Sequence, residues 1–187
     1  MEKDAERVLD ALGERLKFFT QIGVEFIPSP ASSRQSRYLS LREEILRCQR
    51  CGLARERMNA VPGEGSLEAA LMFVGEAPGR DEDIQGKPFV GRAGQLLTKI
   101  IQAMSFRREE VYITNVVKCR PPKNRTPHRE EIEKCRGYLL EQIQIINPRV
   151  IVTLGKVAAD FFIQSPMGMT ALRGQFHEFG AIRIMPT

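Results

Sequence analysis

The segment VYITNVV, residues 111–117, is a β-branched run that is typical of a central strand in a sheet. Three other segments have the apolar composition of buried strands: ALMFVG at 70–75, RVIVTLG at 149–155 and AIRIMP at 181–186. The segments between them place apolar residues at helical spacing, over 94–104, 129–146 and 156–162. Strands that alternate with helices favour parallel pairing. The sequence therefore predicts an α/β fold, a three-layer α/β/α sandwich around a mostly parallel four-stranded sheet.

Ligand sites in such sheets form where loops leave the carboxyl ends of the strands. Three predicted loops do so here, after Gly75, Val117 and Leu154. The loop after Val117 carries five basic residues and no acid: Lys118, Arg120, Lys123, Arg125 and Arg129. Such a loop suits a phosphate backbone, although a solvated basic connector fits the same composition.

Length and composition set outer limits on the class of protein. The 187 residues suffice for one well-buried core but not for two ordinary domains. Hydrophobic residues make up 42% and charged residues 27% of the chain, and no segment approaches the roughly 18 apolar residues that span a bilayer. The N-terminal segment mixes acids and bases, unlike a secretory signal. We therefore expect a cytoplasmic protein with no membrane partner.

The N-terminal part of the chain is predicted to be an accessory element. Apolar residues at helical spacing over 1–23 indicate an amphipathic helix: Val8, Leu9, Leu12, Leu16 and Phe19. The Pro/Ser-rich segment that follows, IPSPASSRQSR, indicates a flexible linker over 28–37. We thus expect a helix and linker over 1–38 and one main domain over 39–187.

The four cysteines have an asymmetric spacing. Cys48 and Cys51 form a C-x-x-C pair, whereas fifteen residues separate Cys119 from Cys135. A reducing compartment argues against two disulfides. The spacing alone leaves three interpretations open: an iron–sulfur cluster, a zinc site, or buried thiols beside a small zinc or redox pair.

Two long motifs resemble the family 4 uracil-DNA glycosylases of bacteria and archaea: GEAPGRDEDIQGKPFVGRAG at 75–94 and ITNVVKCRPPKNRTP at 113–127. The resemblance extends from about Leu41 to the end of the chain and includes the four cysteines. It implies a uracil-DNA glycosylase-like fold and a base-excision repair enzyme that hydrolyses the N-glycosidic bond of flipped-out deoxyuridine in DNA. It also implies a structural [4Fe-4S] cluster held by Cys48, Cys51, Cys119 and Cys135. We expect a monomer.

The resemblance also assigns roles to single residues. It implies that Phe89 stacks on uracil and that the Asn115 amide reads the pyrimidine edge, an arrangement that opposes the amino group of cytosine. By composition alone, Phe89 also fits a core position and Asn115 a cap. The resemblance further implies that Glu76 and Glu82 are catalytic carboxylates that position water or balance charge on the sugar. It places Ala77 and Asn124 near the substrate, and Lys123 and Arg125 in contact with DNA.

One family motif is missing from this sequence. The family continues past the fourth strand into a motif that begins His-Pro, whose histidine stabilises the uracil anion, but the sequence ends at Thr187. We therefore expect a truncated chain that folds but is slow or inactive in catalysis. The alternative functions are a catalytically impaired DNA- and uracil-binding iron–sulfur module and a redox-sensing cluster protein.

Overall fold

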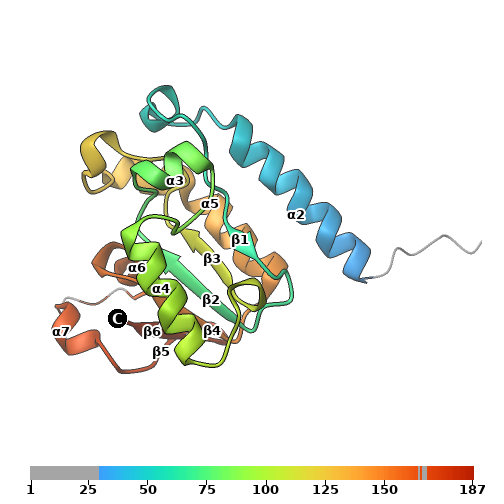
Figure 1. Cartoon of the computed structure of the whole chain (residues 1–187), viewed down its shortest axis with the longest axis vertical. Coiled ribbons are helices and arrows are strands. Elements are labelled where there is room, and N and C mark those ends of the chain that lie inside the picture. The colour runs from blue at the N-terminus through green and yellow to red at the C-terminus, as the bar shows by residue number, and fades with distance from the viewer. Residues whose placement is uncertain (1–29, 164, 166–167) are drawn as a thin grey trace, which may run out of the picture. The chain divides into compact units, whose positions relative to one another are not determined.

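The computed structural model describes residues 30–163, 165 and 168–187 (Figure 1). Within these residues, Arg34–Thr187 form one compact unit. The helix predicted over 1–23 lies outside the described residues.

The predicted linker is wrong from Pro30 onward, because helix α2 spans Pro30–Arg47. Proline is compatible with the first turn of a helix, where its missing N–H has no partner to lose. Further along α2, Leu41 and Ile45 lie four residues apart and are fully buried. Burial of this apolar stripe stabilises a helix whose first half is otherwise polar.

The predicted parallel sheet is confirmed and is extended by a short strand at each edge. Its six strands lie in the order β1-β3-β2-β4-β6-β5, and the four central strands pair in parallel. The edge strands β1 and β5 pair antiparallel with their neighbours. The strands are β1 Glu64–Gly65, β2 Leu71–Gly75, β3 Tyr112–Asn115, β4 Val150–Thr153, β5 His177–Phe179 and β6 Ile182–Pro186.

The three helices predicted between the strands are present, and the structure adds shorter ones. The α-helices after α2 are α3 Arg80–Gln85, α4 Arg92–Ala103, α5 Arg129–Ile146, α6 Lys156–Phe162 and α7 Met169–Leu172. Three single-turn 3₁₀ helices are η1 Gly52–Arg55, η2 Arg108–Glu110 and η3 Pro122–Asn124. Among the described helices, none is long and apolar enough to cross a membrane.

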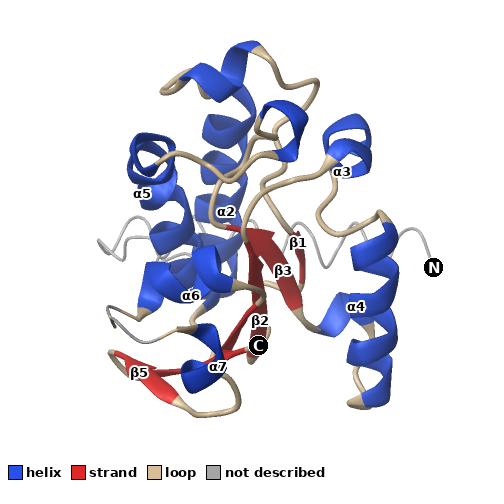
Figure 2. Ribbon diagram, turned by 90° about the vertical axis from the view of Figure 1, so that its left-hand side faces the viewer, coloured by secondary structure: helices blue, strands red, loops and turns tan. Residues whose placement is uncertain are grey.

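The helices cover both faces of the sheet, which gives the predicted three layers (Figure 2). On the α4 face the core is formed by Phe73, Leu97, Ile101, Val111 and Ile113. On the other face α2, α5 and α6 pack in a larger cluster, which includes Leu41, Ile45, Val74, Leu139, Ile143 and Ala158. The chain leaves β2 toward α4 and leaves β3 toward α5. Because these connections run to opposite faces, the carboxyl ends of these two strands are where a ligand site is expected.

Candidate functional site

The candidate site begins at the paired last residues of β2 and β3. Gly75 and Asn115 are partners in the parallel register. The pairing continues past the strands, since the Val116 N–H donates to the Gly75 carbonyl at 2.8 Å and the Val117 N–H donates to the Glu76 carbonyl at 3.1 Å. The two loop starts are therefore held side by side, and the residues that follow each strand face the same space.

Asn115 presents an unpaired amide at this end of the sheet. The residue is 1% exposed, yet neither Nδ2 nor Oδ1 has a hydrogen-bond partner among the described residues. Leaving a buried polar group unsatisfied costs about 1–3 kcal/mol. An amide kept in that condition offers one donor and one acceptor to a bound molecule.

Phe89 lies across from Asn115, with Gly75 between them. A methyl group on Gly75 would stand 2.5 Å from the Asn115 Oδ1 and 2.5 Å from the Phe89 Cζ. The half-buried Phe89 adopts a φ of 51°, a conformation that is rare for a bulky residue and typical of functional loops. Its backbone is in direct contact with Gly94, where no Cβ fits. The structure thus brings together the two residues predicted to bind the base, in a slot that we call the Phe89–Asn115 slot.

Glu76 and Ala77 follow Gly75 directly and are half-buried. Among the described residues, the Glu76 carboxylate has no hydrogen-bond or ion-pair partner. It is therefore free to contact water or substrate at the slot. Ala77 packs against the core on the α5 face.

Glu82 has a different environment from Glu76. Its Oε2 accepts the Gly79 N–H at 3.0 Å, and its Oε1 accepts the N–H groups of Val90 and Gly91 at 2.9 Å each. The first contact caps α3, and the other two fix the chain beside Phe89. Glu82 thus joins the two halves of the loop after β2. The one sequence signal for this role is a Glu at the third position of a short helix, as in a capping box.

The basic loop after β3 contains one exposed and one paired cation from the predicted DNA contacts. Lys123 is exposed, and Asn124 receives a hydrogen bond on Oδ1 from the Arg120 Nε at 2.7 Å. Arg125 instead makes a two-point ion pair with the Glu131 carboxylate, at 2.8 and 2.7 Å. The hydrogen bond from Arg125 lowers the pKa of the Glu131 carboxyl. Arg125 therefore ties the loop to α5.

Lys118 does not belong to the basic surface of this loop, contrary to the prediction from sequence. It is 1% exposed and its Nζ donates to Thr114 Oγ1, the Asn115 carbonyl and Gln142 Oε1, each at 2.7 Å. Burial lowers the pKa of this amine to about 7. Sequence reasoning missed this inward position, because a lysine next to a Pro-rich loop has no sign of burial in its neighbours.

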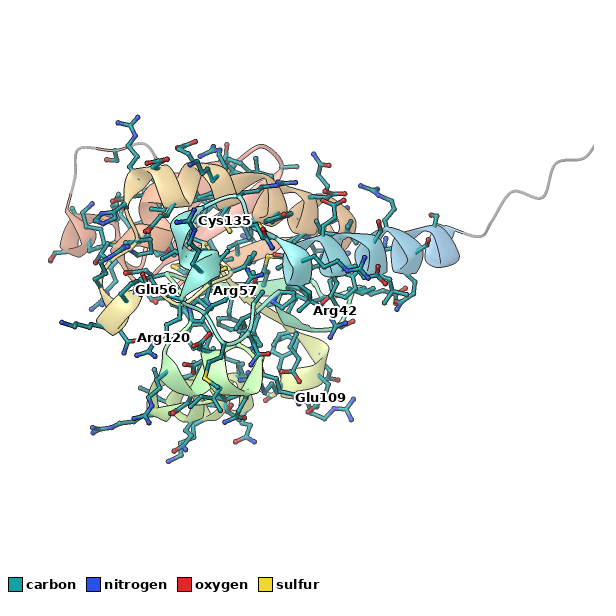
Figure 3. The ribbon with its side chains drawn as sticks, turned by 90° about the horizontal axis from the view of Figure 1, so that it is seen from above. Arg42, Glu56, Arg57, Glu109, Arg120 and Cys135 are labelled. Carbon is teal, nitrogen blue, oxygen red and sulfur yellow. The ribbon has the colours of Figure 1, made fainter. Side chains whose placement is uncertain are left out.

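The four cysteines line one small cavity at the end of α2, together with Arg57 and Tyr138, and Figure 3 labels Arg57 and Cys135 there. All four are free thiols. Three sulfurs receive N–H groups: Arg57 Nη1 donates to Cys119 at 2.9 Å, the Lys118 amide to Cys135 at 3.3 Å and the Arg50 amide to Cys48 at 3.5 Å. Burial raises the pKa of the Cys119 thiol above its ordinary value. Burial also raises the pKa of the Cys135 thiol, to about 11.

Among the described residues, no group of three or more Cys, His, Asp or Glu side chains is arranged to hold a metal ion. The four cysteines share one cavity, and their thiols are donors that either zinc or an iron–sulfur cluster takes.

Comparison with known proteins gives consistent matches over this part of the chain. The family model described as the uracil DNA glycosylase superfamily matches residues 62–187. The chain is 57% identical over 118 residues to the type-4 uracil-DNA glycosylase of Archaeoglobus fulgidus and 50% identical over 147 residues to that of Thermotoga maritima. It is 47% identical over 154 residues to the type-4 enzyme of Saccharolobus solfataricus.

These matches span different shares of the two sequences. The aligned part covers 63% of this chain and 59% of the Archaeoglobus protein, and 78% of this chain and 77% of the Thermotoga protein. For the Saccharolobus protein the shares are 78% and 71%. The matched superfamily segment begins ahead of β1 and contains the Phe89–Asn115 slot, Cys119 and Cys135.

Proposed function

This chain belongs to the type-4 family of the uracil-DNA glycosylase superfamily, and from this membership we propose that it hydrolyses the N-glycosidic bond of deoxyuridine in DNA as a step of base-excision repair. The single observation that carries the proposal is the unpaired Asn115 amide facing Phe89 across Gly75. A uracil ring offers a π-face for stacking and an edge on which acceptors alternate with a donor. In the slot, Phe89 could stack on the face and the Asn115 amide could pair with the edge.

Recognition of uracil in this slot requires the base to leave the duplex, because the glycosidic bond is inaccessible in stacked DNA. Phe89 would stack on the flipped ring, and Ala77 would contact it at the base of the loop. Asn115 would donate to uracil O4 through Nδ2 and accept from N3–H through Oδ1. Cytosine places an amino group and a bare nitrogen at these positions, so the same amide orientation would reject it.

The bond-breaking step would involve Glu76 more directly than Glu82. The transition state carries positive charge on the sugar and negative charge on uracil O2. The free Glu76 carboxylate could orient the attacking water or balance the sugar charge. Glu82 has its oxygens committed to three backbone N–H groups, so we assign it to holding Phe89 in place. Asn124 would stand at the edge of the site.

We further propose that Cys48, Cys51, Cys119 and Cys135 hold a [4Fe-4S] cluster. The four sulfurs line one cavity, and three of them receive N–H hydrogen bonds, which suits thiolate ligands of a cluster. When bound, the cluster would supply a structural cross-link and no step of the hydrolysis. The cysteines would join the end of α2 to both ends of the basic loop.

DNA would meet the basic loop through Lys123, while Arg125 shapes the loop through its pairing with Glu131. Four cysteines that hold a cluster instead of disulfides would suit a reducing location such as the cytoplasm. We place the enzyme there and treat it as a monomer. The reported relatives are named as glycosylases, and none of these matches supports a catalytically impaired module.

The test is release of free uracil from a deoxyuridine-containing oligonucleotide, measured beside the same oligonucleotide with thymidine. The chain should release uracil, and Asn115→Ala and Phe89→Ala should each reduce the rate by on the order of a hundredfold. Leu96→Ala, a change at an exposed residue of α4, is the matched control and should act like the unaltered chain. Equal rates for the unaltered chain and both slot variants would refute the proposed site.

A further inference from the structure

Lys118 touches both the cysteine cavity and the slot, although the proposed reaction uses it in neither. Its backbone N–H donates to the Cys135 sulfur at 3.3 Å, and its side chain reaches the Asn115 carbonyl at 2.7 Å. It is among the largest fully buried side chains of the described residues. A buried lysine is rare unless it is paired or has a defined task.

The hydrogen bonds of the Lys118 amine are complete. An ammonium group has three donors, and three acceptors lie at 2.7 Å: Thr114 Oγ1, the Asn115 carbonyl and Gln142 Oε1. The acceptors are themselves oriented, because Thr114 Oγ1 donates to the Pro62 carbonyl at 2.9 Å and Gln142 Nε2 donates to the same carbonyl at 2.6 Å. The network joins β3, α5 and the chain before β1 through one nitrogen.

The Asn115 carbonyl is the only member of this network that belongs to a slot residue. The Asn115 amide has no hydrogen-bond partner in the part of the chain that the structure describes, so its direction depends on the backbone that carries it. The hydrogen bond from the Lys118 Nζ holds the Asn115 carbonyl, and this fixes the plane of the peptide bond after Asn115. The orientation of that peptide in turn constrains the direction in which the Asn115 side chain leaves the strand. Discrimination between uracil and cytosine needs that direction to be constant.

We propose that Lys118 is a positioning residue for base recognition: by holding the Asn115 carbonyl to Thr114 and Gln142, it fixes the orientation of the Asn115 amide in the slot. This inference rests on the proposed function, because it takes the slot to be the uracil site. Lys118 does not touch the base. It acts through Asn115.

The test compares binding of two oligonucleotides that differ in one base. One carries 2′-fluoro-2′-deoxyuridine, whose fluorine slows bond cleavage, and the other carries thymidine at the same place. Lys118→Met keeps the length of the side chain but removes the three donors. The Lys118→Met variant should lower the ratio of affinities, uracil analogue over thymidine, by about tenfold, which corresponds to one or two lost hydrogen bonds to a charged group. Its affinity for the thymidine oligonucleotide should stay within about twofold of that of the unaltered chain.

A second pair of variants covers the case in which Lys118→Met does not fold. Thr114→Val removes one acceptor of the Lys118 amine at nearly constant shape, and Thr114→Ser restores the hydroxyl. The valine variant should lose about threefold of the preference and the serine variant should regain it. A purely structural role would lower affinity for both oligonucleotides together and leave their ratio unchanged. Iron and sulfide content is measured in each variant to separate damage at the cysteines from damage at the slot.

Two outcomes overturn the inference: a folded Lys118→Met protein with the original preference, or a serine variant that behaves like the valine variant. Asn115→Ala separates this failure from failure of the proposed function. Loss of preference in Asn115→Ala but not in Lys118→Met would reject only the positioning role. Unchanged preference in both would reject the slot as the uracil site.

Discussion

The Phe89–Asn115 slot includes the last residue of β3 and the cysteine cavity includes Cys119 from the loop that follows it, but the polar atoms of the two regions differ in their pairing. In the slot, the Asn115 amide and the Glu76 carboxylate have no partners among the described residues. In the cavity, three of the four sulfurs receive N–H groups, and the neighbouring Lys118 amine has three acceptors. In these two regions, the unpaired polar groups lie where the base is proposed to bind, and the paired ones lie around the cysteines.

The largest expected effect is loss of the cysteine centre. Cys119→Ser should abolish iron and sulfide binding and release the basic loop from α2, since Arg57 also loses its contact with the sulfur. We expect loss of several kcal/mol of stability, as when other structural metal centres are removed. Metal analysis and thermal unfolding measure this, with the exposed Gln49→Ala as control. Full iron content in the Cys119 variant would contradict the assignment.

The next test sets the two glutamates of the loop against each other. Glu76→Gln should reduce uracil release by about a hundredfold with little change in stability, because the carboxylate has no partner to lose. Glu82→Gln should cost about 1–3 kcal/mol of stability, because an amide nitrogen would face backbone N–H groups that now bond to oxygen. Denaturation and uracil release are measured on both variants. The contrast fails if Glu82→Gln unfolds at the same denaturant concentration as the unaltered chain.

A smaller effect is expected when low pH protonates Glu131 and breaks its ion pair with Arg125. The pKa of Glu131 is lowered in the folded protein by Arg125, so its stabilisation is complete above the usual glutamate pKa of about 4.3 and is lost as pH falls through the lower folded value. Glu131→Gln should therefore melt lower than the unaltered chain by on the order of 3 °C at pH 7. The gap should close in acid. A gap that does not shrink as pH falls would exclude the ion pair as its source.

The smallest expected effect lies on the exposed part of the basic loop. Lys123→Ala should reduce the slope of log affinity against log salt by about one, on DNA with or without uracil. Lys99→Ala on α4, also exposed, should leave the slope unchanged. A Lys123 variant that loses affinity only for uracil-containing DNA would move this residue from the scaffold to the slot.

The layers of the fold could be predicted because each central strand is a continuous apolar run and each long helix keeps its apolar spacing. The edge strands β1 and β5 could not, since two or three residues carry no alternation to detect. The error at Pro30 has a different source: local composition indicates a linker, whereas packing of Leu41 and Ile45 stabilises the helix from a distance.

The residues of the candidate site could be predicted from the sequence more fully than the contacts between them. The two sequence motifs pointed to Phe89 and Asn115. The hydrogen bonds of Glu82 and the buried position of Lys118 depend on contacts between distant segments, which a single sequence does not reveal. Charge on its own was a poor guide to the basic loop, where Arg125 is neutralised by Glu131 and Lys118 is buried.

The backbone of Phe89 carries a practical consequence for anyone who selects variants of this protein. A φ of 51° suits glycine or asparagine and disfavours a bulky aromatic by about 1–2 kcal/mol. A library screened for thermal tolerance would therefore enrich smaller residues at position 89 and discard the ring. Thermal stability and the proposed base recognition would then be opposing selections at this one residue, so gains in heat resistance should be sought elsewhere in the molecule.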